Sequence, residues 1–273
     1  MKALALGSAT ARELLGRPFT QVVLAATGLL LFLSSMIPSF TLEPEGDLKF
    51  MTDVGMAAVG MGLILIGLWP AATFLVDETA ERTLLTLLSK PLSRRDYLVG
   101  RYLGVLGALA ASALLLGVLF LGSVWLTEGG ALTSRLDRFF EEAGMDEHHH
   151  GGEEGAPANT PAPPVRWRLA GTVLLGLGQA AVLSAVGLAF STRLPVLPNL
   201  AATAGLFLAG HLRAPGILRL IVPDFACFEM SDAVARGALI PWPYVAGCLG
   251  YAALYVAGTL LVATLLFERR ELT

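Results

Sequence analysis

The sequence predicts an all-α integral membrane protein with six transmembrane helices and both termini in the cytoplasm. Of its 273 residues, 55% are hydrophobic and only 15% are charged, whereas about 25% are charged in an ordinary soluble domain. The mean hydropathy is +0.66. Six apolar stretches contain no Asp, Glu, Lys or Arg and qualify, or nearly qualify, as membrane-spanning helices. They are residues 19–37, 54–76, 102–126, 169–190, 194–210 and 244–267.

The charge distribution predicts the orientation. With the N-terminus inside, the segments between the stretches carry eleven basic and seven acidic residues on the cytoplasmic side, and eight basic and fifteen acidic residues outside. Basic residues near the spans favour the cytoplasmic side. Eighteen residues precede the first stretch and no small-residue cleavage site follows it, so we expect an anchor rather than a signal peptide.

The remaining composition excludes several classes of protein. A net charge of −3 does not favour nucleic-acid binding. Two cysteines, Cys227 and Cys248, are too few for a disulfide framework or a tetrahedral metal site, and we interpret them as unrelated free thiols. Small residues such as Gly100 and Gly104 predict close contacts between helices.

Residues 1–18 form a predicted N-terminal amphipathic helix, with anchoring at the membrane surface as the default interpretation. Its apolar residues Leu4, Ala11, Leu14 and Leu15 are expected to face lipid, and its charged residues Arg12, Glu13 and Arg17 the surface.

Residues 77–93 form the cytoplasmic loop between the second and third stretches. We expect a short amphipathic helix over residues 77–90, which Pro91 ends because proline cannot donate a backbone hydrogen bond. Ser93 is then the predicted N-cap of the helix that leads into the third stretch, with Asp96 in its first turn. The loop helix either transmits movement to the two attached spans or only anchors the loop. Its apolar face consists of Ala80, Leu84, Leu87 and Leu88.

Residues 127–168 form a large extracytoplasmic insertion. It begins with helix-like spacing over 132–143 and continues as a run rich in Gly, Pro and charge, a composition typical of disorder. His148, His149 and His150 are weak metal-ligand candidates, because consecutive residues in a loop cannot preset a coordination geometry. The alternative is a solvated acidic loop.

The fifth stretch and the segment after it are predicted to be irregular. Pro195 and Pro198 interrupt residues 194–210, so we expect a broken or partly re-entrant helix. Residues 211–243 contain an apolar run over 215–223 and an amphipathic pattern over 224–237. We interpret both as outer interfacial or re-entrant helices, with an ordinary loop as the alternative.

Few polar groups stand out as chemical candidates. Gln21 and Gln179 lie within the predicted spans and are expected to hydrogen-bond between helices. The stretches contain no carboxylate or histidine, which argues against a proton-coupled transporter. An intramembrane enzyme would have to use a loose cluster of His211, Asp224 and Glu229, and no catalytic residue is assigned.

The sequence of residues 78–104 resembles a loop of type-2 ATP-binding-cassette (ABC) exporter permeases. That family has an acidic residue, Gly-Thr-Leu, Leu-Leu, Pro, Ser-Arg and a Gly-Lys leading into the third span. Residues 197–200, 222–240 and 267–272 are also similar. The insertion is similar to the subgroup that includes nitrous-oxide-reductase maturation and gliding-motility permeases. Arg82 replaces the family's glycine and Arg101 its lysine. Matching features fall on Glu78, Glu81, Thr83, Leu84, Leu87, Leu88, Pro91, Ser93, Arg94, Gly100 and Arg101.

The resemblance implies a single permease domain over residues 1–273 in the bacterial cytoplasmic membrane. It implies a dimer with a second copy or a paralogue and a separate cytoplasmic ATPase that binds ATP and Mg²⁺. No G-x-x-x-x-G-K-[ST] motif occurs in this chain, and no cofactor is expected in it. Carried over residue by residue, coupling to the ATPase would involve Glu78, Glu81, Arg82, Thr83, Leu84, Leu87, Leu88, Pro91 and Arg94.

The alternative function is a non-transporting membrane scaffold or assembly factor that recruits an extracytoplasmic partner through residues 127–168. The sequence names no substrate and leaves open a transport or a mechanical role.

Overall fold

The computed structural model describes residues 2–36, 44–80, 94–128, 165–212, 222–230, 233–234 and 240–268, and its regular elements there are all helices. They are α1 (Lys2–Gly16), α2 (Pro18–Met36), α3 (Pro44–Ala80), α5 (Arg94–Glu128), α7 (Val165–Ser191), α8 (Val196–His211), the short 3-10 helix η2 (Phe225–Phe228) and α11 (Trp242–Glu268).

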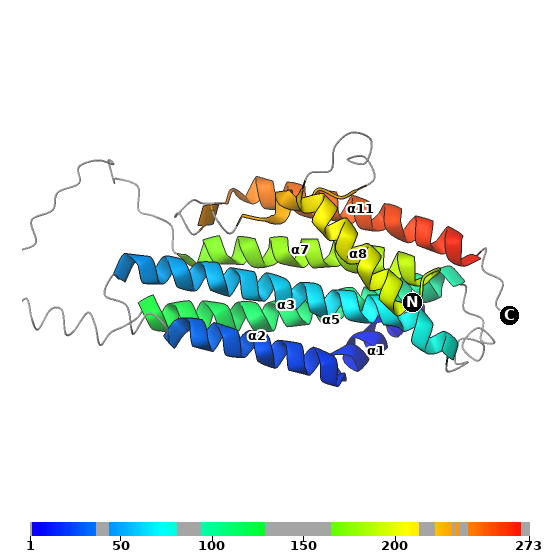
Figure 1. Cartoon of the computed structure of the whole chain (residues 1–273), viewed down its shortest axis with the longest axis horizontal. Coiled ribbons are helices and arrows are strands. Elements are labelled where there is room, and N and C mark those ends of the chain that lie inside the picture. Colours follow the sequence, from blue (N-terminus) through cyan, green and yellow to red (C-terminus); the bar gives the residue numbers. More distant parts are fainter. Residues whose placement is uncertain are drawn as a thin grey trace, which may run out of the picture.

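The long helices form a bundle around α7 (Figure 1). α7 contacts α3, α5, α8 and α11, and 72% of its apolar span is buried. α11 lies at the edge of the described bundle, with only 17% of its span buried. Large apolar side chains on α2, α5 and α11 point away from the bundle, and examples are Phe32, Leu114 and Leu254. A water-soluble surface would not tolerate so many, whereas lipid does.

Within the described residues, the predicted apolar stretches fall on helices except at Leu194 and Pro195, which precede α8. Four of these helices meet the length and composition of a membrane span. The four spans are Thr52–Thr73, Arg95–Val124, Leu169–Ser191 and Trp242–Phe267. The bent pair Leu4–Gly16 and Pro18–Ser34 would make a fifth. α8 is apolar but has only 16 residues, so the six-span count stays a prediction.

α8 is continuous, and the predicted break within it is wrong. Pro195 occupies the N-cap and Pro198 lies in the first turn of the helix. Backbone N–H groups in a first turn have no partner within the helix, so proline is tolerated there.

α3 and α5 extend well beyond the predicted spans. With 37 and 35 residues, they are about 50–55 Å long at the usual rise of an α-helix, against a hydrocarbon core of about 30 Å. The predicted outer loop 38–53 is therefore helical from Pro44 onward. At the other end, α3 continues unbroken to Ala80, because residues 71–80 contain no glycine or proline that would end the helix.

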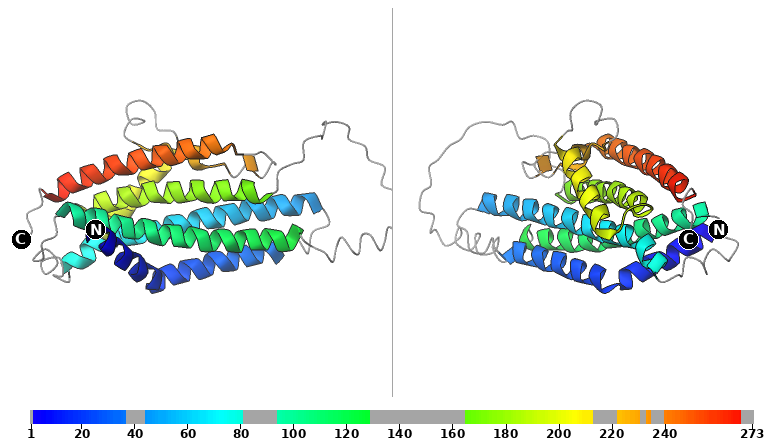
Figure 2. Two further views of the ribbon diagram at one scale, coloured as in Figure 1. Left: turned by 180° about the vertical axis from the view of Figure 1, so that it is seen from behind. Right: turned by 45° about the vertical axis from the view of Figure 1, so that its right-hand side comes forward.

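One end of the bundle gathers the start of α1, the end of α3, the start of α5 and the end of α11 (Figure 1). The two ends of the described chain thus lie at the same end of the bundle, and the orientation of the termini in the membrane stays a prediction. α1 meets α2 at 61° near Arg17 and turns along α5 (Figure 2).

Candidate functional site

The first candidate site is the contact between α1 and the start of α5, beside the connection from α3. Here the two backbones approach closely through small residues. A Cβ atom on Gly7 would lie 3.2 Å from the carbonyl oxygen of Gly100, and one on Gly104 would lie 2.4 Å from the Cβ of Thr10. Gly100 and Gly104 therefore serve the close helix contact that their spacing predicts.

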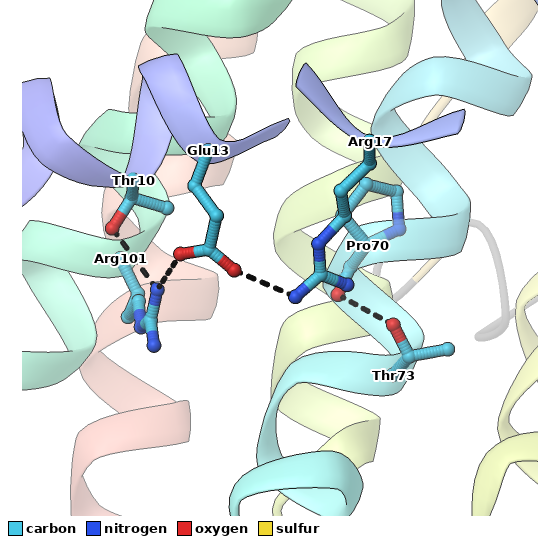
Figure 3. A network of polar contacts seen from close by, with 6 residues as sticks. All are labelled: Thr10, Glu13, Arg17, Pro70, Thr73 and Arg101. Atoms are coloured by element: carbon cyan, nitrogen blue, oxygen red, sulfur yellow. Dashed lines mark hydrogen bonds and ion pairs between the residues drawn. The ribbon is translucent and has the colours of Figure 1, made fainter. Parts of the chain in front are cut away.

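An ionic network fixes this contact. Arg101 on α5 donates hydrogen bonds to Thr10 Oγ1 at 3.1 Å and to Glu13 Oε2 at 3.4 Å, both on α1 (Figure 3). Arg17 donates to the other oxygen of the same carboxylate at 2.8 Å. The Arg101 guanidinium also lies 5.8 Å from the centre of the Tyr97 ring. The Arg101 side chain is only 12% exposed, so Glu13 is the counter-ion that permits its burial.

The prediction that the apolar residues of the N-terminal helix face lipid is wrong for most of them. Leu14 is 1% exposed and belongs to the main core, and Ala11 faces Gly107. Leu4, at 67% exposed, is free of the bundle, as expected. The reason is α5, whose glycines offer a closer-fitting surface than lipid. Glu13 likewise lies between two arginines rather than simply at the surface.

The predicted coupling residues lie at the edge of the described chain. Glu78 is in the last turn of α3, and Arg94 is the first residue of α5. Asp96 is in the first turn of α5, as predicted. A separate loop helix that begins at Asp77 is wrong, because residues 77–80 continue α3. The remaining members lie outside the described residues, and they are Glu81, Arg82, Thr83, Leu84, Leu87, Leu88 and Pro91.

The second candidate site is a pocket of about 240 Å³ between α3, α5, α7, α8 and the segment 222–230, called here the central pocket. Most of its wall is apolar and flexible. Its larger apolar side chains are Met56, Met61, Met230, Phe120, Phe207 and Phe228. Methionine and glycine in the wall let such a cavity change shape.

Three polar side chains from three elements meet in the central pocket. His211 Nε2, at the end of α8, lies 3.4 Å from Gln179 Nε2 on α7 and 3.4 Å from Glu229 Oε2. His211 Nδ1 lies 3.0 Å from the carbonyl oxygen of Phe207. The imidazole also packs against the rings of Phe207 and Phe225, which contact each other.

These contacts place His211 beside the middle of a candidate span, although the residue lies outside the apolar stretches of the sequence. Gln179 is near the middle of the span Leu169–Ser191, and His211 is within reach of it. Hydropathy placed His211 just past the end of the fifth stretch, but α8 is inclined to α7 (Figure 1), and its last residue, His211, contacts Gln179 of α7. Gln179 bonds between helices as predicted, whereas Gln21 is exposed on α2.

Of the loose cluster of three acids and bases, the structure brings together His211 and Glu229. Asp224 lies apart: its side chain accepts a hydrogen bond from the Ala226 amide and caps η2, and its own amide donates to Tyr251 Oη at 3.0 Å. The predicted amphipathic helix over 224–237 is wrong at Glu229, which is extended. Within the described ranges, no group of three His, Cys, Asp or Glu could hold a metal. His148–His150 lie outside them.

The two cysteines are neighbours, which corrects their interpretation as unrelated thiols. Cys248 Sγ on α11 donates to the carbonyl oxygen of Cys227 at 3.4 Å, and Cys227 Sγ donates to that of Asp224 at 3.0 Å. Both cysteines are free. Burial, together with the nearby Cys248 and Asp224, raises the pKa of the Cys227 thiol to about 12. The Cys227 thiol is therefore protonated and weakly reactive near neutral pH.

Comparison with known families decides the identity. The sequence pattern of the "ABC-2 family transporter protein" family matches residues 48–192, more than half of the chain. The chain belongs to the ABC-2 transporter family. It is thus a membrane permease of an ABC transporter, a type of subunit that is generally not catalytic and typically works with a cytoplasmic ABC ATPase. No match to the chain was found among curated proteins.

The matched region of this ABC-2 permease runs from α3 to the end of α7 and includes the connection between α3 and α5. α1 lies outside the match but packs on it through Gly100, Arg101 and Gly104. Sequence reasoning missed the pairing of Glu13 with Arg101. An available signal was a basic residue inside an apolar helix, flanked by glycines, which requires a counter-ion from another element.

Proposed function

We propose that this ABC-2 permease forms a dimer with a second copy or a paralogue, and that a separate cytoplasmic ATPase drives it through the connection between α3 and α5. ATP and Mg²⁺ bind to that partner. The family relationship supports this arrangement. So does the density of basic residues in the short segments at one end of the chain's spans, which we place on the cytoplasmic side of a bacterial inner membrane.

The observation that carries the proposal is the tight contact of α1 with the start of α5. A displacement of the α3–α5 connection acts directly on the first turns of α5. α1 follows, because the glycine contacts leave no free space and Arg101 binds Glu13 across the two helices. Through its 61° junction with α2, α1 passes the displacement to a second long helix. A short push at the loop would thus move α1, α2 and α5 together.

Co-purification and ATPase activity test this proposal. The permease is co-expressed with an ABC ATPase and reconstituted in lipid, and wild type is compared with Glu78→Ala, Leu87→Asp and Gly104→Ala. We expect the two loop variants to lose the ATPase or its coupled activity. Gly104→Ala should keep the ATPase bound but weaken the coupled activity, because the loop is intact and the α1–α5 contact is disturbed.

Replacement of residues 129–164 by a short Gly/Ser linker, which removes the insertion but keeps α5 and α7 whole, separates the permease from the scaffold alternative. A permease keeps its ATPase and its coupled activity without this insertion, whereas a scaffold loses its partner. If no ATPase travels with wild type, or if the loop variants behave as wild type, the coupling proposal fails.

A further inference from the structure

The hydrogen bonds of His211 determine which of its nitrogens carries a proton. Nδ1 lies 3.0 Å from the carbonyl oxygen of Phe207. A carbonyl oxygen only accepts hydrogen bonds, so Nδ1 is the donor and carries hydrogen in both charge states of the ring. In the neutral imidazole, Nε2 is therefore a bare acceptor.

The two neighbours of Nε2 make opposite demands on it. The Gln179 amide nitrogen, at 3.4 Å, is a donor and suits the neutral ring. The Glu229 carboxylate oxygen, also at 3.4 Å, is an acceptor and suits only the imidazolium, in which Nε2 donates. Nε2 cannot accept from Gln179 and donate to Glu229 at the same time.

The choice between these partners has a structural consequence, because they belong to different parts of the fold. Gln179 lies on α7, the most buried span. Glu229 lies on the segment 222–230, which packs on α8 and α7 through η2 and forms one wall of the central pocket. With His211 bonded to Gln179, this wall is attached to α11 through the Asp224 amide and the Cys227 carbonyl, but it has no charged bond to α8. A bond to Glu229 adds a charged pair that ties the wall to α8.

Other charges near the imidazole are few. Among the residues that line the central pocket, those from α3, α5 and α7 are uncharged, and the titratable ones are His211 and Glu229. Asp224, on the same segment as Glu229, directs its carboxylate to the Ala226 amide. The charge state of His211 is thus the main variable in this part of the pocket.

We propose that His211 is a proton-binding site within the membrane that controls the wall of the central pocket. Uptake of one proton at Nε2 ends its bond with the Gln179 amide, creates the bond to Glu229 and fastens the segment 222–230 to α8. Release of the proton ends this charged tie to α8, while the hydrogen bonds from α11 to the segment remain. Histidine is the side chain whose ordinary charge change lies between about pH 5 and 8. This inference does not depend on an ATPase partner.

Nitrogen NMR of the imidazole tests the first step. His148, His149 and His150 are replaced by Ala in the full chain, which leaves His211 as its only histidine. At about pH 8 we expect the neutral Nδ1–H tautomer, and at about pH 5.5 a ring with both nitrogens protonated. An Nε2–H tautomer at the higher pH, or a ring that stays neutral at the lower one, would overturn the proposal.

Hydroxyl-radical footprinting tests the second step in wild type. The oxidation of Met230, on the moving wall, is divided by that of Met61, an exposed residue on the α3 side of the pocket. We expect this ratio to fall about threefold between about pH 8 and pH 5.5.

Two variants decide whether the footprint reports the proposed pair. Glu229→Gln removes the charged partner and should abolish the pH dependence, whereas Asp96→Asn makes the same chemical change on an exposed carboxylate at the start of α5 and should retain it. A constant ratio in wild type, or an unchanged pH response in Glu229→Gln, would refute the proposed control of the pocket wall by the His211–Glu229 bond.

Discussion

The α1–α5 contact and the central pocket are built in opposite ways. In the first, glycines bring two backbones together, and the Glu13 carboxylate on α1 binds both Arg101 on α5 and Arg17 at the bend between α1 and α2. In the second, methionines and phenylalanines surround an open volume of about 240 Å³, and one imidazole has two competing partners. Close packing transmits displacement, whereas a loosely filled cavity with long side chains accommodates it. The comparison teaches that one region is suited to move as a unit and the other to change shape.

The largest expected effect is a loss of stability at the α1–α5 contact. Gly104→Ala places a Cβ atom 2.4 Å from that of Thr10 and 3.0 Å from the carbonyl oxygen of Gly7. We expect a loss of about 1–3 kcal/mol in unfolding free energy, because neither helix can retreat without breaking the Arg101 network. Thermal unfolding in detergent measures it. Gly205→Ala is the control, since a Cβ there meets no atom within 4 Å and alanine favours the helix. Equal stability of the two variants would contradict the account.

Replacement of Gly210, at the central pocket, should destabilise only the neighbouring segment. A Cβ on Gly210 would lie 2.4 Å from the carbonyl oxygen of Pro223, so Gly210→Ala should push the segment 222–230 away from α8. We expect amide exchange in this segment to rise about tenfold, the equivalent of about 1.4 kcal/mol, with little change in α1 and α5. Hydrogen exchange followed by mass spectrometry resolves the two regions. An equal rise in both would mean that they are not independent.

The hydrogen bonds of Arg101 at the α1–α5 contact should contribute less to stability than the glycine packing does. Arg101→Ala removes the bonds to Thr10 and Glu13 and should cost about 1 kcal/mol, because Glu13 is half exposed and keeps Arg17. Arg101→Lys retains the charge but not the planar, multiply donating group, so we expect partial recovery. A double-mutant cycle with Glu13→Gln measures the coupling. A coupling energy near zero would assign the contact to packing alone.

The smallest expected effect concerns the thiols behind the pocket wall. Because burial raises the pKa of Cys227 to about 12, the reactive thiolate is scarce at neutral pH, and its fraction grows about tenfold per pH unit well below that value. Maleimide labelling of Cys227 should therefore accelerate about tenfold per unit between about pH 7 and 9, without a plateau. The rate is followed in Cys248→Ser, which isolates the thiol. Fast labelling at about pH 7 would show that the wall opens more freely than the described contacts allow.

Sequence reasoning predicted the helices well, because membrane helices follow hydropathy. The start of α5 after Ser93 and the packing role of Gly100 and Gly104 also followed from local rules. The extension of α3 at both ends could not be predicted in this way. Polar residues such as Asp47 and Glu78 mark the membrane boundary and not the end of a helix. The meetings of Glu13 with Arg101, and of His211 with Gln179 and Glu229, join distant parts of the chain. No local pattern encodes such contacts.

The most direct test of the central claim is a pair of distance measurements in the reconstituted transporter with its ATPase. One pair of spin labels, at Arg12→Cys and Ala111→Cys, spans the α1–α5 contact. The other pair, at Leu208→Cys and Met230→Cys, spans the central pocket and leaves Glu229 intact. The native cysteines are replaced by serine in both. Pulsed electron spin resonance compares each distance without nucleotide and with bound, non-hydrolysed ATP. We predict that the pocket distance changes and the α1–α5 distance does not. A change across α1–α5 with a constant pocket would contradict the account.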